Sequence, residues 1–157
     1  MLIGRQEDTG FGGRIDLLAI APDGSLVLVE LKRDRTPRDV VAQALDYASW
    51  VEKLRAEDIA AIYTRFAPGR SLTDDFQQRF GQPLDEDALN RNHQIIIVSA
   101  SLDASTERIV AYLSERDIPI NVLCFQVFAN GDDQLISRTW LFDPVLTQVN
   151  AAAMPEG

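Results

Sequence analysis

Two short apolar runs near the N-terminus, residues 14–20 and 26–32, constrain the fold more than any other part of the sequence. Both are rich in Leu, Ile and Val and have the length of strands. The first run contains Asp16, and the second ends with Glu30 and Lys32. Strands seldom bury charge without a partner, because an isolated ion in a low-dielectric interior costs many kcal/mol. These three side chains are therefore the first candidates for a functional site.

The residues between the two runs are typical of a tight turn. Pro22 stands at the second turn position and Gly24 at the fourth, the pattern of a type I turn closed by a glycine bulge with positive φ. Such a loop pairs Ala21 with Ser25 across an antiparallel hairpin. The alternative is a two-residue loop at Asp23 and Gly24, which would shift the register by one residue and turn one strand's side chains to the other face.

The bulged turn would bring the three charges together. Asp16 then falls opposite Glu30, and Lys32 points to the same face. Two neighbouring carboxylates repel each other and favour a shared hard cation such as Mg²⁺, and a lysine beside them can orient a water or stabilise charge on a phosphorus under attack. This set suits metal-assisted phosphodiester hydrolysis. In the alternative, Glu30 and Lys32 lie in solvent at a strand end and Asp16 pairs with an arginine.

The next segment predicts a helix from residue 37 to about residue 55. Thr36 is a suitable N-cap, Pro37 suits the first helical position, and Asp39 follows three residues after the cap. Gln43 and Tyr47 are four residues apart and share one face, next to an apolar stripe. The helix would present an amide and a phenol beside the charged strand ends, although each residue alone is more often an ordinary helix-surface side chain.

Taken together, these residues resemble the PD-(D/E)XK nuclease superfamily, in the branch with a Gln-x-x-x-Tyr motif after the lysine. The resemblance rests on Asp16, on Glu30-Leu31-Lys32 after the hairpin, and on Gln43-Ala44-Leu45-Asp46-Tyr47 in the following helix. Residues 13–18, 29–33 and 43–47 are more closely similar to the catalytic domain of structure- and mismatch-specific endonucleases of archaea and actinobacteria. The match covers residues 4–55 well and the rest of the chain in outline.

The resemblance implies a restriction-endonuclease-like fold, an α/β domain with a mixed central β-sheet flanked by helices. It implies that Asp16 and Glu30 hold a divalent metal, Mg²⁺ or Mn²⁺, and that Lys32 serves the attacking water. Gln43 and Tyr47 would support the site and contact the DNA substrate.

The sequence departs from the family pattern in two places. Ile15 precedes Asp16, where proline is common. In similar domains an N-terminal helix with an acidic residue often completes the metal site, whereas this chain begins at Met1 in or near the first strand. Glu7 and Asp8 are the acidic residues available to replace it, although their spacing does not indicate that either does.

Net charge argues against binding DNA through the field of the whole protein. The chain has 24 acidic and 15 basic residues and a net charge of −9, whereas such proteins usually carry excess Lys and Arg. A local basic edge beside the site would give weak, salt-sensitive binding to phosphates. The arginines expected to form it are Arg14, Arg33, Arg35 and Arg38. The alternative is a solvated connection between strand and helix.

The 157 residues are 46% hydrophobic, which suits one domain with a core over residues 1–150. Residues 151–157 are expected to form a disordered tail. Further helices are predicted at 59–66, 73–80 and about 104–116, and further strands at 94–99, 120–128 and 134–142. No run approaches the roughly 18 apolar residues of a membrane span. The single Cys124 lies in an apolar run and is expected to be a buried small side chain, as suits a reducing cytoplasm. We also expect no membrane partner and no organic cofactor.

Two functions from different classes follow. The first is a Mg²⁺-dependent DNA endonuclease in which Asp16 and Glu30 bind the metal, the backbone carbonyl of Leu31 adds a ligand, and Lys32 positions the water. The second is a non-catalytic module of the same fold that binds nucleic acid or a protein, with an incomplete metal site because the N-terminal helix is absent. An exposed apolar edge near the N-terminus would also favour a homodimer.

Overall fold

Six strands and four helices make up the part of the chain that this computed structural model describes, residues 1–32 and 37–144. In chain order they are β1 (Leu2–Asp8), β2 (Arg14–Ile20), β3 (Leu26–Leu31), α1 (Pro37–Val51), α2 (Ala56–Phe66), α3 (Leu72–Phe80), β4 (His93–Ser99), α4 (Ala104–Ser114), β5 (Ile120–Asn130) and β6 (Asp133–Trp140).

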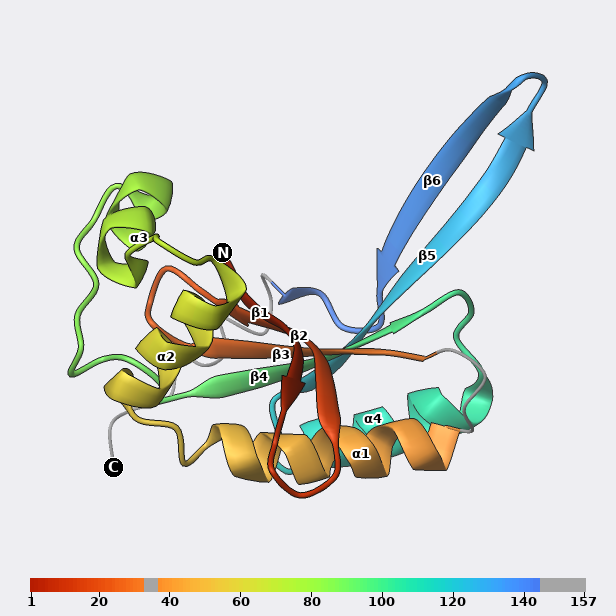
Figure 1. Cartoon of the computed structure of the whole chain (residues 1–157). Coiled ribbons are helices and arrows are strands. Elements are labelled where there is room, and N and C mark those ends of the chain that lie inside the picture. The colour runs from red at the N-terminus through yellow and green to blue at the C-terminus, as the bar shows by residue number, and fades with distance from the viewer. Residues whose placement is uncertain (33–36, 145–157) are drawn as a thin grey trace.

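The strands form one mixed sheet in which their spatial order is their chain order (Figure 1). The β1–β2, β2–β3 and β5–β6 pairs are antiparallel, whereas β3, β4 and β5 run parallel. Parallel neighbours need crossover connections. The first crossover contains α1, α2 and α3, and the second contains α4. This architecture confirms the predicted α/β fold with a mixed sheet flanked by helices.

One face of the sheet holds much of the core, and α1 and α4 cover it (Figure 1). A row of directly paired residues crosses four strands on this face, and all four are buried: Leu18, Leu28, Ile95 and Ile120. Burying each such side chain contributes about 1.5–3 kcal/mol. Helix α1 lies against β3 and β4, and α4 lies against β5. The strand ends that carry Asp16 and Glu30 thus belong to a sheet that is packed against helices.

Helix α1 ends four residues earlier than predicted, at Val51. The Leu54 N–H donates to the Val51 carbonyl at 3.0 Å in a tight turn. The side-chain amide of Asn90 then donates to the carbonyls of Val51 and Leu54 at 2.8 and 3.0 Å. These bonds satisfy carbonyls that a helix end leaves open. The helix therefore ends at Val51, and the prediction that it continues to about residue 55 is wrong. Its predicted N-cap, Thr36, lies outside the described residues.

The remaining predicted elements are present with small shifts at their ends. Helices α2, α3 and α4 correspond to the expected helices, and β4, β5 and β6 to the expected strands. The N-terminal residues form a strand of their own, β1, which pairs with β2. The expected tail at 151–157 lies outside the described residues. None of the described helices has the length and apolar character needed to cross a bilayer.

Candidate functional site

The β2–β3 turn has the bulged geometry that the sequence predicts. The Ala21 N–H donates to the Ser25 carbonyl at 2.9 Å, and the Gly24 N–H donates to the Ala21 carbonyl at 3.0 Å. Gly24 has a φ of 84°, a left-handed conformation that glycine adopts without a steric penalty. Leu17 consequently pairs with Val29, the predicted register. The two-residue alternative is wrong.

The paired residues of β2 and β3 end at Leu17 and Val29, immediately before the two predicted carboxylates. Beyond this point the side chains take the place of backbone partners. The Asp16 N–H donates to Glu30 Oε1 at 3.2 Å, and the Leu31 N–H donates to Asp16 Oδ2 at 2.9 Å. Each carboxylate therefore binds a main-chain amide of the opposite strand, and the predicted juxtaposition of Asp16 with Glu30 is confirmed.

Glu30 is a buried carboxylate, with an exposed fraction of 0%. It follows Leu28 on the helix-covered face of β3 and pairs with buried Ile97 of β4. A carboxylate in this position is stable as an anion only with hydrogen bonds and a nearby cation, because burial penalises its charge. The Asp16 N–H supplies one hydrogen bond. The alternative in which Glu30 lies in solvent is therefore wrong.

Asp16 is half-buried, and hydrogen bonds fix both of its carboxylate oxygens. The Gln6 side-chain amide donates to Oδ1 at 2.9 Å, while Leu31 N–H donates to Oδ2. Gln6 lies in β1 with a φ of 51°, which is uncommon for a residue other than glycine. Both donors are neutral, so they orient the carboxylate without cancelling its charge. Each oxygen keeps a second lone pair that a cation could use.

The Lys32 ammonium reaches the start of α4, a helix on the same face as Glu30. It donates to Asp103 Oδ2 and, at 3.2 Å, to Thr106 Oγ1. Asp103 is the N-cap of α4 and also accepts from the Thr106 N–H at 2.9 Å. The hydrogen bond from Lys32, followed by that from the Thr106 amide, holds the pKa of Asp103 well below its usual range. Lys32 and Asp103 thus form an ion pair that joins the residue after β3 to the start of α4.

Tyr47 supports the start of β2 from the buried side of α1. Its phenol oxygen accepts a hydrogen bond from the Arg14 N–H at 3.2 Å. A Cβ placed on Gly13 would lie 2.3 Å from Tyr47 Cε1, so only glycine allows this close approach. Gln43 lies one turn earlier in α1 and is half-buried. Tyr47 thus binds β2 two residues before Asp16, and its role at the site stays a prediction.

Two of the four predicted DNA-contacting arginines can be placed. Arg14 begins β2 and Arg38 lies in the first turn of α1, and both are exposed. Arg33 and Arg35 fall outside the described residues. Exposed guanidinium groups at these two positions are accessible to a phosphate backbone.

The two acidic residues considered as a third ligand have other partners. Glu7 forms an ion pair with Arg65 of α2. Asp8 accepts a hydrogen bond from the Gly10 N–H at 2.7 Å, within the β1–β2 turn. The side chain that β1 directs to Asp16 is the neutral amide of Gln6.

Two carboxylates and the main-chain carbonyl of Leu31 are the oxygen atoms that could hold a metal at this strand end. Within residues 1–32 and 37–144, no group of three or more His, Cys, Asp and Glu side chains is arranged to hold a metal ion. The donor set nevertheless suits a hard cation, because Mg²⁺ retains several waters and is often bound by one or two carboxylates. The neutral donors around Asp16 leave its charge available for such an ion.

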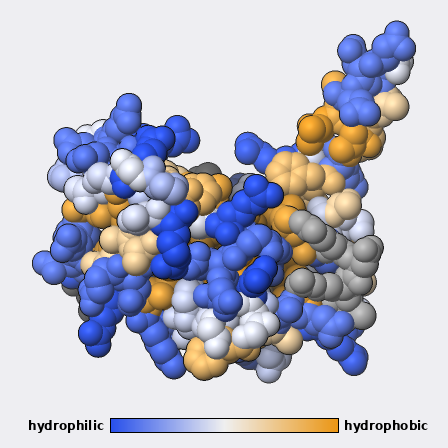
Figure 2. Space-filling model, in the orientation of Figure 1, coloured by the Kyte–Doolittle hydropathy of each residue, from blue (hydrophilic) through white to orange (hydrophobic). Residues whose placement is uncertain are grey.

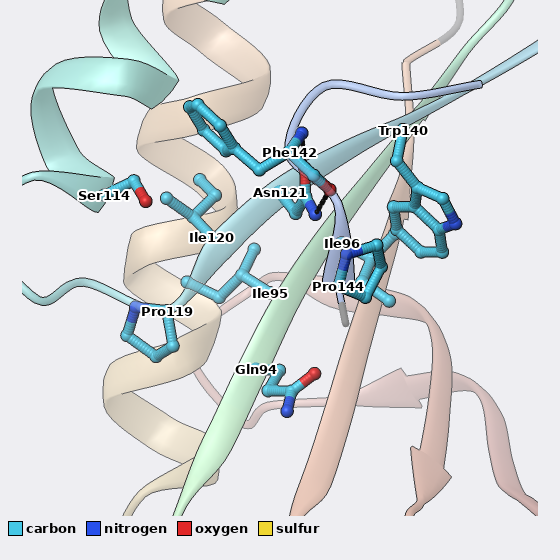
Figure 3. A pocket seen from close by; sticks show the side chains of 10 residues that line it. All are labelled: Gln94, Ile95, Ile96, Ser114, Pro119, Ile120, Asn121, Trp140, Phe142 and Pro144. Carbon is cyan, nitrogen blue, oxygen red and sulfur yellow. Dashed lines mark hydrogen bonds between the residues drawn. The ribbon is translucent and has the colours of Figure 1, made fainter. Parts of the chain in front are cut away.

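A separate apolar cavity of about 290 Å³ lies where β4 and β5 begin, at the opposite end of the parallel strands from Glu30 (Figure 3). Ile96, Ile120 and Trp140 are among its lining residues, and none of the described lining side chains is charged. The side chain of Asn121 is already paired with the backbone of Phe142, at 2.8 and 3.0 Å. This cavity offers no acid, base or metal ligand for hydrolysis.

Sequence reasoning missed four residues that shape the site: Gln6, Gly13, Asp103 and Thr106. Asp103 is the N-cap of α4, the helix that the sequence predicts from about residue 104. Its pairing with Lys32 joins positions 71 residues apart, which local patterns cannot reveal. Gly13 had one local signal, since it directly precedes the strand that carries Asp16.

Comparisons with models of protein families, with curated proteins and with solved structures find no match. A functional proposal for this site therefore rests on its own residues and their chemistry.

Proposed function

We propose that this protein is a divalent-metal-dependent DNA endonuclease of the PD-(D/E)XK type, hydrolysing phosphodiester bonds. The observation that carries the proposal is the arrangement of Asp16 and Glu30 where the β2–β3 pairing ends, with each carboxylate oriented by an amide of the other strand. Lys32 follows two residues after Glu30, which completes the Asp, Glu-x-Lys set.

Each residue has a defined part in this proposal. Asp16, Glu30 and the Leu31 carbonyl would hold Mg²⁺ or Mn²⁺, which supplies Lewis-acid polarisation of a phosphate when bound. Lys32 would stabilise negative charge on the phosphate and orient the attacking water, after exchanging its bond to Asp103. Tyr47 keeps the strand that carries Asp16 in place, and Gln43 supports the substrate side.

The DNA backbone would lie along the exposed arginines. Arg14 and Arg38 are exposed, and Arg33 and Arg35 belong to the same basic segment of the sequence. Because the net charge is −9, this local edge would act against the field of the whole protein. Binding should therefore weaken steeply as salt concentration rises.

A reducing cytoplasm is the setting that we propose. The only cysteine, Cys124, is a buried free thiol whose pKa is raised by burial, so it serves as a small apolar side chain.

The second candidate function is a non-catalytic module that binds DNA or a protein. The observation that favours it is the ion pair of Lys32 with Asp103, because that contact already uses the ammonium group. The absence of a third acidic ligand among the described residues points in the same direction.

Cleavage assays with flapped, mismatched and linear DNAs separate the two candidates. Mg²⁺ or Mn²⁺ is titrated into the wild type, Asp16→Asn and Lys32→Met. Asp46→Asn changes an exposed acid on α1, and Lys53→Met changes the only other lysine of the chain, which is also exposed. We expect the two site variants to lose about 10²-fold or more of the cleavage rate, while both controls keep it.

The remaining outcomes are equally informative. Metal binding by the wild type without cleavage of any DNA would support the non-catalytic module. Equal cleavage by the wild type, Asp16→Asn and Lys32→Met would refute the assigned site. Circular dichroism of every variant shows whether a loss of activity is caused by unfolding.

A further inference from the structure

The β5–β6 hairpin extends beyond the body of the protein (Figure 1). Its strands remain paired from Phe125 with Arg138 to Asn130 with Asp133. Residues 125–130 and 133–139 are all exposed. An isolated two-stranded hairpin is at best marginally stable in water, so this segment is suited to packing against another surface.

Both faces of the hairpin carry large apolar side chains. Val127 pairs with Ile136 on one face, with exposed fractions of 61% and 70%. Phe128 pairs with Leu135 on the other, with exposed fractions of 50% and 53%. Figure 2 shows a hydrophobic patch on the extended hairpin. Contiguous exposed apolar surface of this kind marks an interaction site.

The outer edge of β6 has no strand beside it within the described chain, since β6 is last in the sheet order. The opposite edge strand, β1, differs. It has a register shift between Leu2 and Gly4, a left-handed Gln6, and α2 packed beside it. Irregular backbone and a covering helix are common protections of an edge strand. Among residues 1–32 and 37–144, the long β6 edge has neither, so it is the edge open to pairing.

The charged residues near the two ends of β6 have opposite signs, with apolar residues between them. Residues 133–138 run acidic, polar, apolar, apolar, polar, basic. Arg138 is the only cation in residues 120–142, and Asp132 and Asp133 are the only anions. In an antiparallel pair centred on Leu135 or Ile136, apolar residues meet at the centre. Arg138 of one copy then lies directly or diagonally opposite Asp132 of the other.

We propose that the free edge of β6 pairs antiparallel with the same edge of a second copy, forming a homodimer through a four-stranded layer. The two-fold arrangement satisfies both open edges at once and matches Arg138 with the acidic turn twice. This inference is independent of the nuclease proposal, because it involves neither Asp16 nor Glu30.

Sedimentation equilibrium of the full chain tests the dimer. We expect a mass of two chains for the wild type and of one chain for Ile136→Lys, which places two like charges near the two-fold axis. Tyr112→Lys, at an exposed apolar residue of α4, should remain dimeric. A monomeric wild type, or a dimer unaffected by Ile136→Lys, would overturn the proposal and leave the hairpin to a different partner.

Cysteine cross-linking tests the edge contact itself. Leu135→Cys or Ile136→Cys should give a disulfide-linked dimer under mild oxidation, because one of them lies at the two-fold axis. Their partners on the inner strand, Phe128 and Val127, serve as matched sites. In edge pairing, cysteines at these inner positions are separated by three strand spacings, about 14 Å, too far for a disulfide. Equal cross-linking from inner and outer strands would overturn edge pairing.

Discussion

Asp16 and Glu30 each bind the backbone of the other's strand. Glu30 Oε1 accepts from the Asp16 N–H at 3.2 Å, and Asp16 Oδ2 accepts from the N–H of Leu31, the residue after Glu30, at 2.9 Å. The exchange occurs directly beyond the last backbone pair of the two strands, Leu17 with Val29. Main-chain amides of a rigid sheet thereby hold both carboxylates in fixed orientations, as a preorganised site requires.

Divalent metal should stabilise the protein through this pair. At a Mg²⁺ concentration 100 times the Kd, binding adds about 2.7 kcal/mol, which corresponds to a rise of roughly 5–10 °C in Tm. Glu30→Gln removes the charge and keeps the shape, so its Tm should respond much less. The exposed Glu52→Gln should respond like the wild type. Calorimetry with and without Mg²⁺ measures these shifts, and an equal response of Glu30→Gln would contradict the assigned ligand.

Gly13→Ala should destabilise the protein by about 1–3 kcal/mol, as overpacking in a core does. The added Cβ would lie 2.3 Å from Tyr47 Cε1, and moving the ring would strain its hydrogen bond with the Arg14 N–H. In a Tyr47→Ala background, the same substitution should cost much less. Urea unfolding of the four proteins gives the coupling energy, and additive losses would show that the ring is not the obstacle.

The Lys32–Asp103 pair should make stability depend on acid pH. Because the folded-state pKa of Asp103 is lowered from its ordinary 3.8, its contribution is fully present above about pH 4 to 5 and is lost as pH falls through the folded pKa. The wild type should therefore be more stable than Asp103→Asn at pH 7, and the difference should shrink below pH 4. Chemical denaturation across this range measures it. A difference that stays constant with pH would refute the assignment.

Asn90→Asp should destabilise the end of α1. The asparagine amide donates to the carbonyls of Val51 and Leu54, and a carboxylate cannot donate these bonds at neutral pH. Leaving the Leu54 carbonyl unsatisfied costs about 1–3 kcal/mol, whereas the Val51 carbonyl keeps its bond from the Leu54 N–H. Aspartate also tolerates the φ of 56° found at position 90, so the backbone is not the cause. The nearby Asn92→Asp, at an exposed position, should change the free energy of unfolding little.

The proposed site was largely predictable where its cause is local. Pro22 and Gly24 determine the turn, and the two-residue repeat of a strand then places Asp16 and Glu30 together. Tyr47 was predictable as a residue facing the hairpin because helix periodicity defines its face. Its contact with Gly13 depends on how closely α1 approaches β2, which no local pattern specifies.

Turn chemistry and strand alternation act within a few residues, so the sequence by itself determined the hairpin, its register and the meeting of the two carboxylates. Only the tertiary structure decided that Lys32 pairs with Asp103, 71 positions away, and that Asn90 ends α1 from 39 positions away. It also decided that the apolar pairs of β5 and β6 extend beyond the helices that cover the sheet. These features depend on the packing of distant elements, because the free energy of an ion pair or a helix cap depends on which groups the fold brings into contact.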